Sequence, residues 1–411
     1  MDLAKLTASI SEAADLLARQ PAAAHQQREE LLKACQKLSA SLEQPREQLE
    51  RATIAMTPVA AVRIAIDMGI FDFVHRSSKE DFTGDELATA ANADPLLVVR
   101  ILRSLVVSRV FTVTALGSYR AEPVVQNLIQ GGCLASFIIM HFDIHFQIIA
   151  KLPSYLRETK YRSPENAHVG PFQHCFSTDK HFFNWLVHKP TLLAAFNQVM
   201  QTGVARHNVQ RWTQTFPVTQ RLQEATFQGT ARLKLVDVGG GVGHESKVLL
   251  ETLPWLKSKG EIILQDIPGV IESMLPELKE AAGCVQAMPH DFFEPQPVKH
   301  AQIYFLGRVL HDWPDAQARI ILRHIRDAMH GDSLLLIHDR VLPEGPAQVH
   351  PSDALVDLHM MALLSSLERT ERQFRVLLDS VGLRLVRVWR PVSAGHHRQA
   401  VLEVVRGIVD T

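Results

Sequence analysis

Residues 237–243 of this 411-residue chain read Asp-Val-Gly-Gly-Gly-Val-Gly and directly follow an apolar run that is rich in β-branched residues. Glycines in such a loop let the backbone turn sharply and approach a ligand where a Cβ atom would collide with it. Nucleotide phosphate sites have similar turns, so the glycines alone do not specify the ligand. They do indicate a strand that ends in a binding loop.

From about residue 230 the chain alternates short apolar runs with segments of helical pattern. The runs that are typical of strands span residues 233–239, 261–267, 284–291, 301–307, 332–339, 383–389 and 400–405. This alternation predicts an α/β fold over residues 226–411, with a Rossmann-like, doubly wound parallel sheet and a hairpin formed by the last two strands. Ligands of such sheets bind at the carboxyl ends of the strands, where the glycine loop lies.

The N-terminal part lacks this alternation and divides into two regions. Residues 1–125 begin with apolar residues at helical spacing and continue as helices and a β-hairpin pattern, which together outline a winged helix. Because the first helices need a partner for their apolar stripe, we expect a homodimer through this domain. Residues 126–225 are helical and rich in aromatic rings, and we expect them to connect the domains and to line a substrate pocket.

The charge balance argues against nucleic acid as a partner. The 43 basic and 44 acidic residues nearly cancel, giving a net charge of -1, and this favours a small, neutral substrate. In the winged helix, the segment 95–107 presents only Arg100 and Arg103 among many aliphatic residues, so we expect it to be buried. A winged-helix regulator that senses a ligand is the non-enzymatic alternative.

Neither a membrane nor an oxidising compartment is indicated. No stretch of about 18 or more apolar residues occurs, and the N-terminus lacks the basic and apolar regions of a signal peptide. The cysteines are far apart and show no CxxC spacing; they are Cys35, Cys133, Cys175 and Cys284. We therefore expect a cytoplasmic protein without disulfides.

Three acids follow one another at the ends of successive predicted strands, at Asp237, Asp266 and Asp291. Asp266 comes 25 residues after Gly241, where an acid can accept both ribose hydroxyls. Asp291 and the adjoining Phe292 suit the amino group and the ring face of adenine. Such a series fits a cofactor with a positive sulfur and no phosphates, so we predict S-adenosyl-L-methionine. The alternative is that the acids only cap helices.

A candidate base follows the fourth strand, where residues 308–315 read Arg-Val-Leu-His-Asp-Trp-Pro-Asp. The near-neutral pKa of His311 suits it to take a proton from a hydroxyl nucleophile. Asp339, at the expected end of the fifth strand, is placed to orient the imidazole, and Glu368 supplies a second carboxylate. Each of these residues also has a structural alternative, as a strand-end acid or as part of a charge cluster at a helix start.

We expect the substrate pocket to be lined by His141, His145, Phe176, Asp312 and Met360. For each of the rings, filling of the hydrophobic core is the alternative. The spacing of His141 and His145 suits two zinc ligands on a helix, but the Glu of an HExxH motif is missing and no third ligand is evident in the sequence. We therefore predict no metal.

Taken in order, the segments DVGGGVG, LQDIPGVI, HDFF, RVLHDWPD, DRVLP and ERT resemble those of fungal and plant-type small-molecule O-methyltransferases, the caffeate O-methyltransferase-like family, over residues 55–405. The resemblance implies N-terminal dimerisation and cation-independent methylation of a hydroxyl on a small aromatic or polyketide-like secondary metabolite, with His311 as the base. It implies that Asp339 and Glu368 orient that base. The cofactor contacts expected on this basis include Gly239, Gly241, Asp266, Asp291, Phe292 and Arg308.

Two positions depart from the pattern of that family. Gly307 stands where many relatives have a basic residue that contacts the cofactor, and Arg308 is beside it, while Asp339 replaces the more familiar Glu. The rival function is that of a pericyclase, since some fungal proteins of this type bind S-adenosylmethionine but catalyse dehydration or cyclisation by electrostatic stabilisation. Retention of His311 favours methyl transfer, and the polar rings His141 and His145 keep the rival open.

Overall fold

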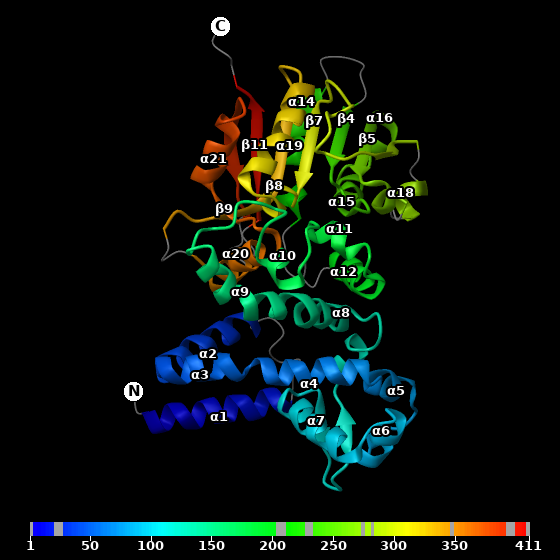
Figure 1. The fold of residues 1–411 in the computed structure, drawn as a ribbon, viewed down its shortest axis with the longest axis vertical. Helices are drawn as coiled ribbons and strands as arrows, with labels where there is room; N and C mark the ends of the chain where they lie inside the picture. The colour runs from blue at the N-terminus through cyan, green and yellow to red at the C-terminus, as the bar shows by residue number, and fades with distance from the viewer. Residues whose placement is uncertain are drawn as a thin grey trace.

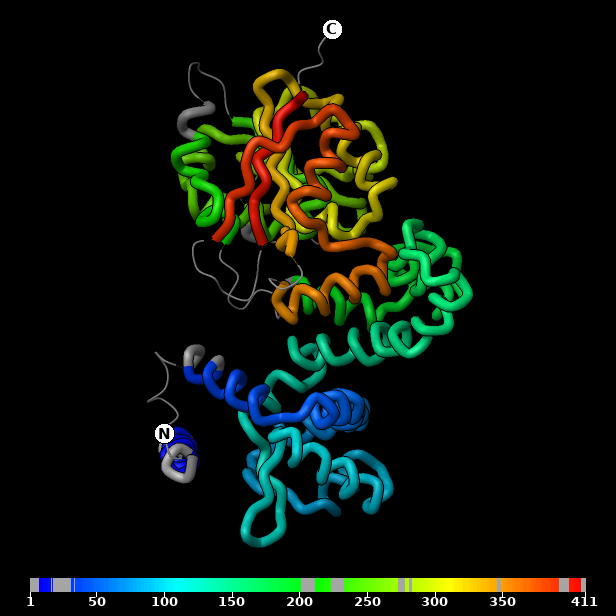
Figure 2. The backbone as a smooth tube through the Cα atoms, turned by 90° about the vertical axis from the view of Figure 1, so that its left-hand side faces the viewer, coloured from blue at the N-terminus to red at the C-terminus, as the bar shows by residue number. Residues whose placement is uncertain are grey.

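The computed structural model describes residues 3–19, 28–202, 211–226, 233–272, 276–280, 283–345, 349–391 and 399–407. The described residues form an elongated molecule, with a helical N-terminal part at one end, the large sheet at the other, and a layer of helices between them (Figures 1 and 2). The predicted α/β fold class is confirmed.

The C-terminal sheet has the strand order β10-β11-β8-β7-β4-β5-β6. Its strands are β4 (Leu233–Val238), β5 (Gly260–Asp266), β6 (Val285–Pro289), β7 (Ile303–Gly307), β8 (Leu334–Leu342), β10 (Leu383–Trp389) and β11 (Gln399–Arg406), and the short β9 (Arg369–Thr370) pairs with β8. Strands β4 to β8 run parallel, whereas β11 is antiparallel to both β8 and β10. The parallel sheet and its terminal hairpin therefore form as the sequence predicts.

Helices cover both faces of this sheet. One face packs on α19 (Asp315–Ala328) and α21 (Glu371–Asp379), which bury residues such as Ile321 and Phe374. The other packs on α13 (Trp212–Thr215), α14 (Val218–Thr226), α15 (His244–Thr252) and α16 (Leu256–Lys259). The short helices α17 (Pro268–Ile271) and α18 (Pro276–Glu280) follow β5. This is the doubly wound arrangement, in which a ligand binds at the carboxyl edge.

The N-terminal domain contains the predicted winged helix. Helices α4 (Met56–Asp67), α5 (Ile70–Arg76), α6 (Gly84–Ala90) and α7 (Pro95–Val107) pack beside a small sheet of β1 (Asp81–Phe82), β3 (Tyr119–Ala121) and β2 (Phe111–Val113), which η2 (Pro123–Asn127) follows. Thr83 and Asp94 cap α6 and α7, because their side-chain oxygens accept the backbone N–H of Glu86 and Leu97. Helix α7 buries four of its aliphatic side chains, as expected of a core helix.

The layer between the two ends combines segments from different parts of the chain. It contains α8 (Cys133–Met140), the π-helical turn η3 (His141–His145), α9 (Phe146–Glu158), α10 (Pro171–Phe176), α11 (Phe182–Leu186) and α12 (Pro190–Thr202), together with α20 (Pro351–Leu364). These helices share one hydrophobic core. The sequence analysis placed only Met360 of α20 near this region and did not predict that the whole helix joins the layer. The domain boundaries at residues 125 and 225 stay a prediction.

Among the described residues, one helix is long and apolar enough to cross a membrane by length and composition, the continuous run Cys133–Glu158. It packs against α4, α12 and α20, and its Asp143 forms an ion pair with Arg63 at 2.8 Å. About a third of its most apolar window, 33%, is buried within the chain. The absence of a membrane span nevertheless stays a prediction.

Candidate active site

The glycine loop turns at the carboxyl end of β4, as predicted. Gly239 and Gly241 have φ values of +67° and +61°, which L side chains rarely adopt. A Cβ atom on Gly239 would lie 3.0 Å from Val309 Cγ2 and 3.3 Å from Phe292 Cε1, whereas the same atom on Gly241 would meet nothing within 4 Å. The loop is therefore packed tightly at its first glycine and opens onto free space at its third.

Asp266 fastens this loop to the end of the neighbouring strand. Its Oδ2 accepts the backbone N–H of Gly241 at 2.8 Å, and its Oδ1 accepts that of Ile267 at 2.8 Å. Burial raises the pKa of this carboxyl, and the two N–H donors partly oppose that rise. A carboxylate has about four acceptor positions, so Asp266 holds the loop and keeps further lone pairs for a ligand.

Asp237 lies beneath the loop and not at an open strand tip. Its side chain is buried, and its Oδ2 accepts a hydrogen bond of 2.5 Å from Ser246 Oγ. Its Oδ1 has no hydrogen-bond partner among the described residues. Burial raises the pKa of Asp237 to about 7. Asp237 therefore supports the glycine loop from the inside, and any contact with a ligand has to pass through its neighbours.

The structure brings Phe292 to the glycine loop, although it follows a strand two places away. Its ring lies beside Gly239 and makes an edge contact with Phe293, with centroids 5.0 Å apart. Asp291 is exposed, and its Oδ1 accepts the backbone N–H of Phe293 at 2.9 Å. The predicted cofactor residues thus gather at one edge of the sheet, around the open side of the loop.

Arg308 follows β7 at the same edge. It has a positive φ of +57°, unusual for a residue with a side chain, and its N–H donates to His338 O at 2.9 Å. Its guanidinium lies 3.8 Å from Glu245, which is in the first turn of the helix after the glycine loop. Arg308 therefore lies close to the predicted cofactor site, although no side-chain contact with the loop itself is seen among the described residues.

His311 lies on the short helical turn η4 (Leu310–Asp312), directly after β7. We call η4 the histidine turn. Its Nδ1 is 3.1 Å from Glu368 Oε1, and its Nε2 is 3.4 Å from Asp312 Oδ1. An ionised carboxylate only accepts hydrogen bonds, so Nδ1 donates to Glu368 and Nε2 is the basic atom of the neutral ring. About a fifth of the His311 side chain is exposed, at 21%, which leaves Nε2 within reach of a substrate.

The acids around His311 make it a strong base. Burial alone would lower the pKa of the ring, but the charges of Asp312, Glu368 and Asp339 outweigh it and raise the pKa to about 10. Burial in turn raises the pKa of Asp312 to about 6 and that of Asp339 to about 7. A phenol titrates near pH 10 in water. The ring therefore keeps its proton up to about that pH, and Nε2 can take a proton from a hydroxyl group only in the neutral form of the ring.

Asp339 forms no hydrogen bond with His311 among the described residues, so of the two effects expected of it, orienting the ring and stabilising its cationic form, only the second fits this geometry and stays a prediction. Strand β8 continues to Leu342, so Asp339 lies inside the strand and is fully buried. Neither of its carboxylate oxygens has a hydrogen-bond partner among the described residues. The orienting hydrogen bond comes from Glu368 alone, and Asp339 influences the ring through its charge.

Arg369 holds the histidine turn in place, a role that the sequence analysis missed. Its guanidinium is almost completely buried and donates to Leu310 O and to Trp313 O, each at 2.8 Å. It also donates to Asp315 Oδ1 at 2.8 Å. The first carbonyl belongs to the first residue of the turn, and the second to the residue that follows it. The signal was present in the sequence, because Arg369 follows Glu368 directly in the ERT segment.

The residues predicted for the substrate pocket separate into two groups. Asp312 lies with His311, as described above. Met360 and Phe176 belong to the hydrophobic core of the helix layer, and His141 and His145 lie on η3, whose Ile144 belongs to the same core. The ring of Phe176 packs on those of two neighbouring aromatic residues, with centroids 5.1 and 4.9 Å away. A role of these four residues in substrate binding stays a prediction.

Glu368→Gln should shift the pH dependence of catalysis. Removing this negative charge lowers the pKa of His311, because a carboxylate that stabilises the imidazolium is lost. The ring then releases its proton at a lower pH, so the rising limb of kcat/KM moves to lower pH and kcat falls. The amide oxygen of Gln can still accept from Nδ1, which preserves the orientation of the ring. Initial rates over a range of pH values measure this shift.

Glu371→Gln is the matched control, because Glu371 pairs with Arg375 and Arg390 on the surface. Its profile should coincide with that of the wild type. An unmoved limb in Glu368→Gln would show that the charge of Glu368 does not set the pKa of the base.

Comparisons with known proteins agree with this geometry. A family model described as an O-methyltransferase domain matches residues 161–384, and one described as an O-methyltransferase dimerisation domain matches residues 55–131. Among curated relatives, a demethylsterigmatocystin 6-O-methyltransferase of Aspergillus flavus is 33% identical over 80% of this chain and 81% of its own.

Two solved structures resemble this protein over almost its whole length. A protein described as a pericyclic reaction enzyme superposes with a TM-score of 0.82 at 30% identity, covering 97% of this chain and 99% of its own. The structure of LepI in complex with SAM gives a TM-score of 0.82 at 30% identity, covering 98% and 100% of the two chains. The chain therefore belongs to the family of S-adenosylmethionine-dependent O-methyltransferases, with an N-terminal dimerisation domain.

Proposed function

We propose that this chain binds S-adenosyl-L-methionine at the glycine loop and methylates a hydroxyl group of a small aromatic or polyketide-like secondary metabolite. The observation that carries the proposal is the position of His311 beside the loop. Strand β7, which leads to His311, pairs with β4, which leads to the glycine loop. Val309 Cγ2 would lie 3.0 Å from a Cβ atom on Gly239, so the segment that leads to the base adjoins the loop.

The residues around the loop fit such a cofactor. Free space lies over Gly241, where a side chain would intrude. Asp266 has lone pairs left for ribose hydroxyls, and Phe292 offers a ring face at the side of the loop. Three acids around His311 provide negative charge in the neighbourhood. The cofactor, when bound, supplies an electrophilic methyl group on a positively charged sulfur.

The side chains of this chain then move the proton of the acceptor. Nε2 of His311 accepts it from the hydroxyl, and Glu368 and Asp312 stabilise the imidazolium that results. Because the acids raise the proton affinity of the ring, they favour the ionised form of the acceptor oxygen, which is the better nucleophile. Arg369 keeps the histidine turn fixed, so that Nε2 stays aligned while the oxygen attacks.

One incubation tests this proposal. The protein is mixed with S-adenosylmethionine and a panel of phenolic and enolic polyketides, and the products are analysed by mass spectrometry. We expect a product that has gained one methyl group, together with S-adenosylhomocysteine. Absence of both across the panel, with cofactor binding confirmed by calorimetry, would count against methyl transfer.

The second candidate function is that of a pericyclase, and one observation favours it. The pericyclic reaction enzyme described above is 30% identical and covers nearly the whole chain. Such a reaction would give a product of unchanged mass, or one that has lost water, without consumption of the cofactor. His311 with its partner Glu368 favours methyl transfer, because a cyclisation does not need a base for a hydroxyl nucleophile.

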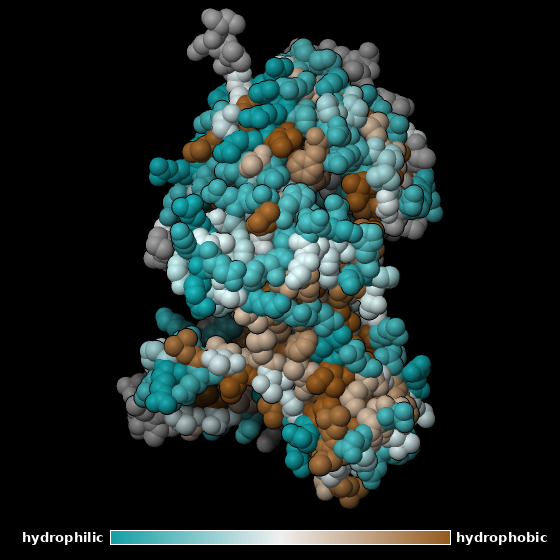
Figure 3. Space-filling model, in the orientation of Figure 1, coloured by the Kyte–Doolittle hydropathy of each residue, from teal (hydrophilic) through white to brown (hydrophobic). Residues whose placement is uncertain are grey.

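We also propose that the protein is a homodimer through its N-terminal domain. The sequence predicted one or two amphipathic helices before residue 55, and this region contains three, α1 (Leu3–Arg19), α2 (Arg28–Leu42) and α3 (Pro45–Ile54). Helix α3 buries none of its residues within one chain. Its Leu49 and Ile54 are 70% and 67% exposed. Figure 3 shows hydrophobic residues gathered at the surface of this end of the molecule. A second subunit would cover them.

Leu49→Glu should therefore shift the protein from dimer to monomer in sedimentation velocity. Because Leu49 contributes nothing to the core of its own chain, the fold should persist, with an unchanged circular dichroism spectrum. Val376→Glu, at a site 59% exposed on α21, is the control and should remain dimeric. A wild type that sediments as a monomer at micromolar concentration would contradict the proposal.

The state of the cysteines suits the proposed cytoplasmic location. Cys35 is exposed, Cys133 is half-buried, and Cys175 and Cys284 are buried, and none of the four is in a disulfide. Free thiols of this kind persist in a reducing compartment. We therefore propose that the protein is cytoplasmic.

A further inference from the structure

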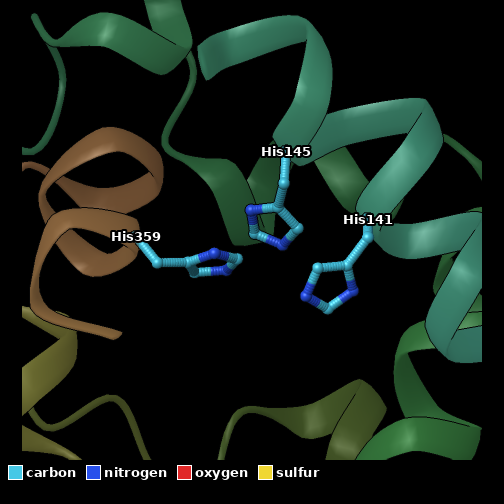
Figure 4. Close-up of side chains that lie close together, drawn as sticks. All are labelled: His141, His145 and His359. Carbon is cyan, nitrogen blue, oxygen red and sulfur yellow. The ribbon is translucent and has the colours of Figure 1, made fainter. Parts of the chain in front are cut away.

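Three histidines of the helix layer point toward one another (Figure 4). His141 and His145 come from the π-helical turn η3, and His359 comes from α20. One ring nitrogen from each lies within 4.8 Å of those of the other two. The ring centroids of His145 and His359 are 3.5 Å apart, and those of His141 and His145 are 4.9 Å apart. The pair noted in the sequence thus acquires a third member from a distant segment.

The hydrogen bonds of these rings leave their nitrogens available. Nδ1 of His141 is 2.8 Å from Phe137 O. A carbonyl only accepts, so this nitrogen carries the proton and Nε2 keeps its lone pair, which is how a backbone carbonyl orients a metal-binding histidine. Neither His145 nor His359 forms a hydrogen bond with another of the residues that the structure describes. His145 is only 6% exposed, yet neither of its ring nitrogens is both completely buried and unpaired, so an ion could reach them.

The protonation state also suits a ligand role. Burial lowers the pKa of His141, lowers that of His145 well below its usual value, and lowers that of His359 to about 4. The mutual repulsion of the rings adds to the effect for His145 and His359. All three imidazoles are therefore uncharged at neutral pH, which is the form that coordinates a metal ion.

We propose that His141, His145 and His359 form a binding site for a divalent transition-metal ion, with Zn²⁺ as the expected occupant. Three neutral imidazoles without a carboxylate favour zinc over magnesium or calcium, which prefer oxygen ligands. Tetrahedral zinc with bonds of about 2.0–2.1 Å would bring the ligand nitrogens to roughly 3.3 Å from one another. The rings therefore close in slightly when the ion binds. The π-helical turn, a feature often found at functional sites, presents two of the three.

The site would leave one coordination position open. Three protein ligands and a free fourth position are the arrangement of zinc ions that bind a small molecule, whereas structural zinc ions have four protein ligands. Helix α20, which carries His359, also contacts the histidine turn. An oxygen of a hydroxyl or carbonyl group is the ligand that this position would take.

Metal uptake tests the proposal independently of methyl transfer. The purified protein is stripped with a chelator and titrated with Co²⁺, whose absorption bands report tetrahedral coordination, and the Zn²⁺ content is measured by mass spectrometry. We expect about one ion per chain and tetrahedral bands. His359→Ala and, separately, His141→Ala should each weaken Co²⁺ binding by more than about 100-fold, since loss of an outer partner alone costs 10–100-fold.

His330→Ala is the matched control, because this histidine is 65% exposed and lies outside the cluster. Its Co²⁺ affinity should equal that of the wild type. Circular dichroism shows whether each variant is folded. A folded wild type that binds no more Co²⁺ than His359→Ala would overturn the proposal, and so would bands of octahedral coordination. In either case the histidines would serve as hydrogen-bonding groups only.

Discussion

His311→Ala is expected to lower kcat by about 10²–10⁴-fold, the range that a general base contributes, while the affinity for S-adenosylmethionine changes little. In the proposed mechanism Nε2 removes the hydroxyl proton, whereas the proposed cofactor site consists of the glycine loop, Asp266 and Phe292 and does not include the imidazole. The rate of methyl transfer is measured from the S-adenosylhomocysteine released. Cofactor affinity is measured by calorimetry.

A second variant separates loss of the base from a general disturbance of the site. His311→Gln keeps a polar side chain of similar length but cannot take a proton, so it should be as inactive as the alanine variant. His324→Gln, on helix α19, should retain full activity. The ring of His324 forms a hydrogen bond of 2.9 Å between its Nε2 and Phe293 O, and a glutamine amide can replace this bond. If cofactor binding disappears together with turnover in both His311 variants, this residue holds the cofactor and is not the base.

Arg369→Met is expected to lower the free energy of unfolding by about 3–5 kcal/mol, the cost of removing one partner from a buried charged network. Its loss leaves the carbonyls of Leu310 and Trp313 buried without donors. The histidine turn loses its support, so kcat should fall as well, while the dissociation constant of the cofactor stays near its wild-type value. Thermal unfolding and single-turnover rates measure the two effects.

Arg390→Met is the control for this variant. Arg390 pairs with Glu371 at 3.0 Å on the surface and is 48% exposed, so its loss should change the free energy of unfolding by less than about 0.5 kcal/mol. Arg369→Lys should recover part of the stability, because an ammonium can reach one carbonyl but not the forked set of acceptors. If Arg369→Met keeps the stability and the kcat of the wild type, the histidine turn does not depend on Arg369 for its conformation.

The sheet could be predicted from the sequence because its signals are local. Apolar runs of strand length alternate with helical segments, and the observed strands β4 to β8, β10 and β11 fall on the predicted runs. The glycine loop and His311 were found for the same reason, since both directly follow a strand. The carboxyl edge of a parallel sheet then brings them together whatever the details of packing.

Contacts between distant segments could not be predicted in this way. The sequence placed Met360 in one pocket with His141 and His145, but nothing local in it indicates the course of α20, so His359 was not recognised as a third member of the histidine pair. The burial of Arg369 likewise depends on the path of the loop after α20. Sequence reasoning assigned the orienting role to both Asp339 and Glu368, whereas the direction of each side chain, which decides that role, is a property of the folded chain.

A labelled methyl group gives the most direct test of the central claim. The protein is incubated with an accepted phenolic substrate and S-adenosylmethionine that carries ¹³C in its methyl group, and the product is examined by NMR. The account predicts a labelled methoxy carbon in amounts equal to the S-adenosylhomocysteine formed, and none with His311→Ala. A rearranged product that contains no label, formed equally well by wild type and variant, would contradict it.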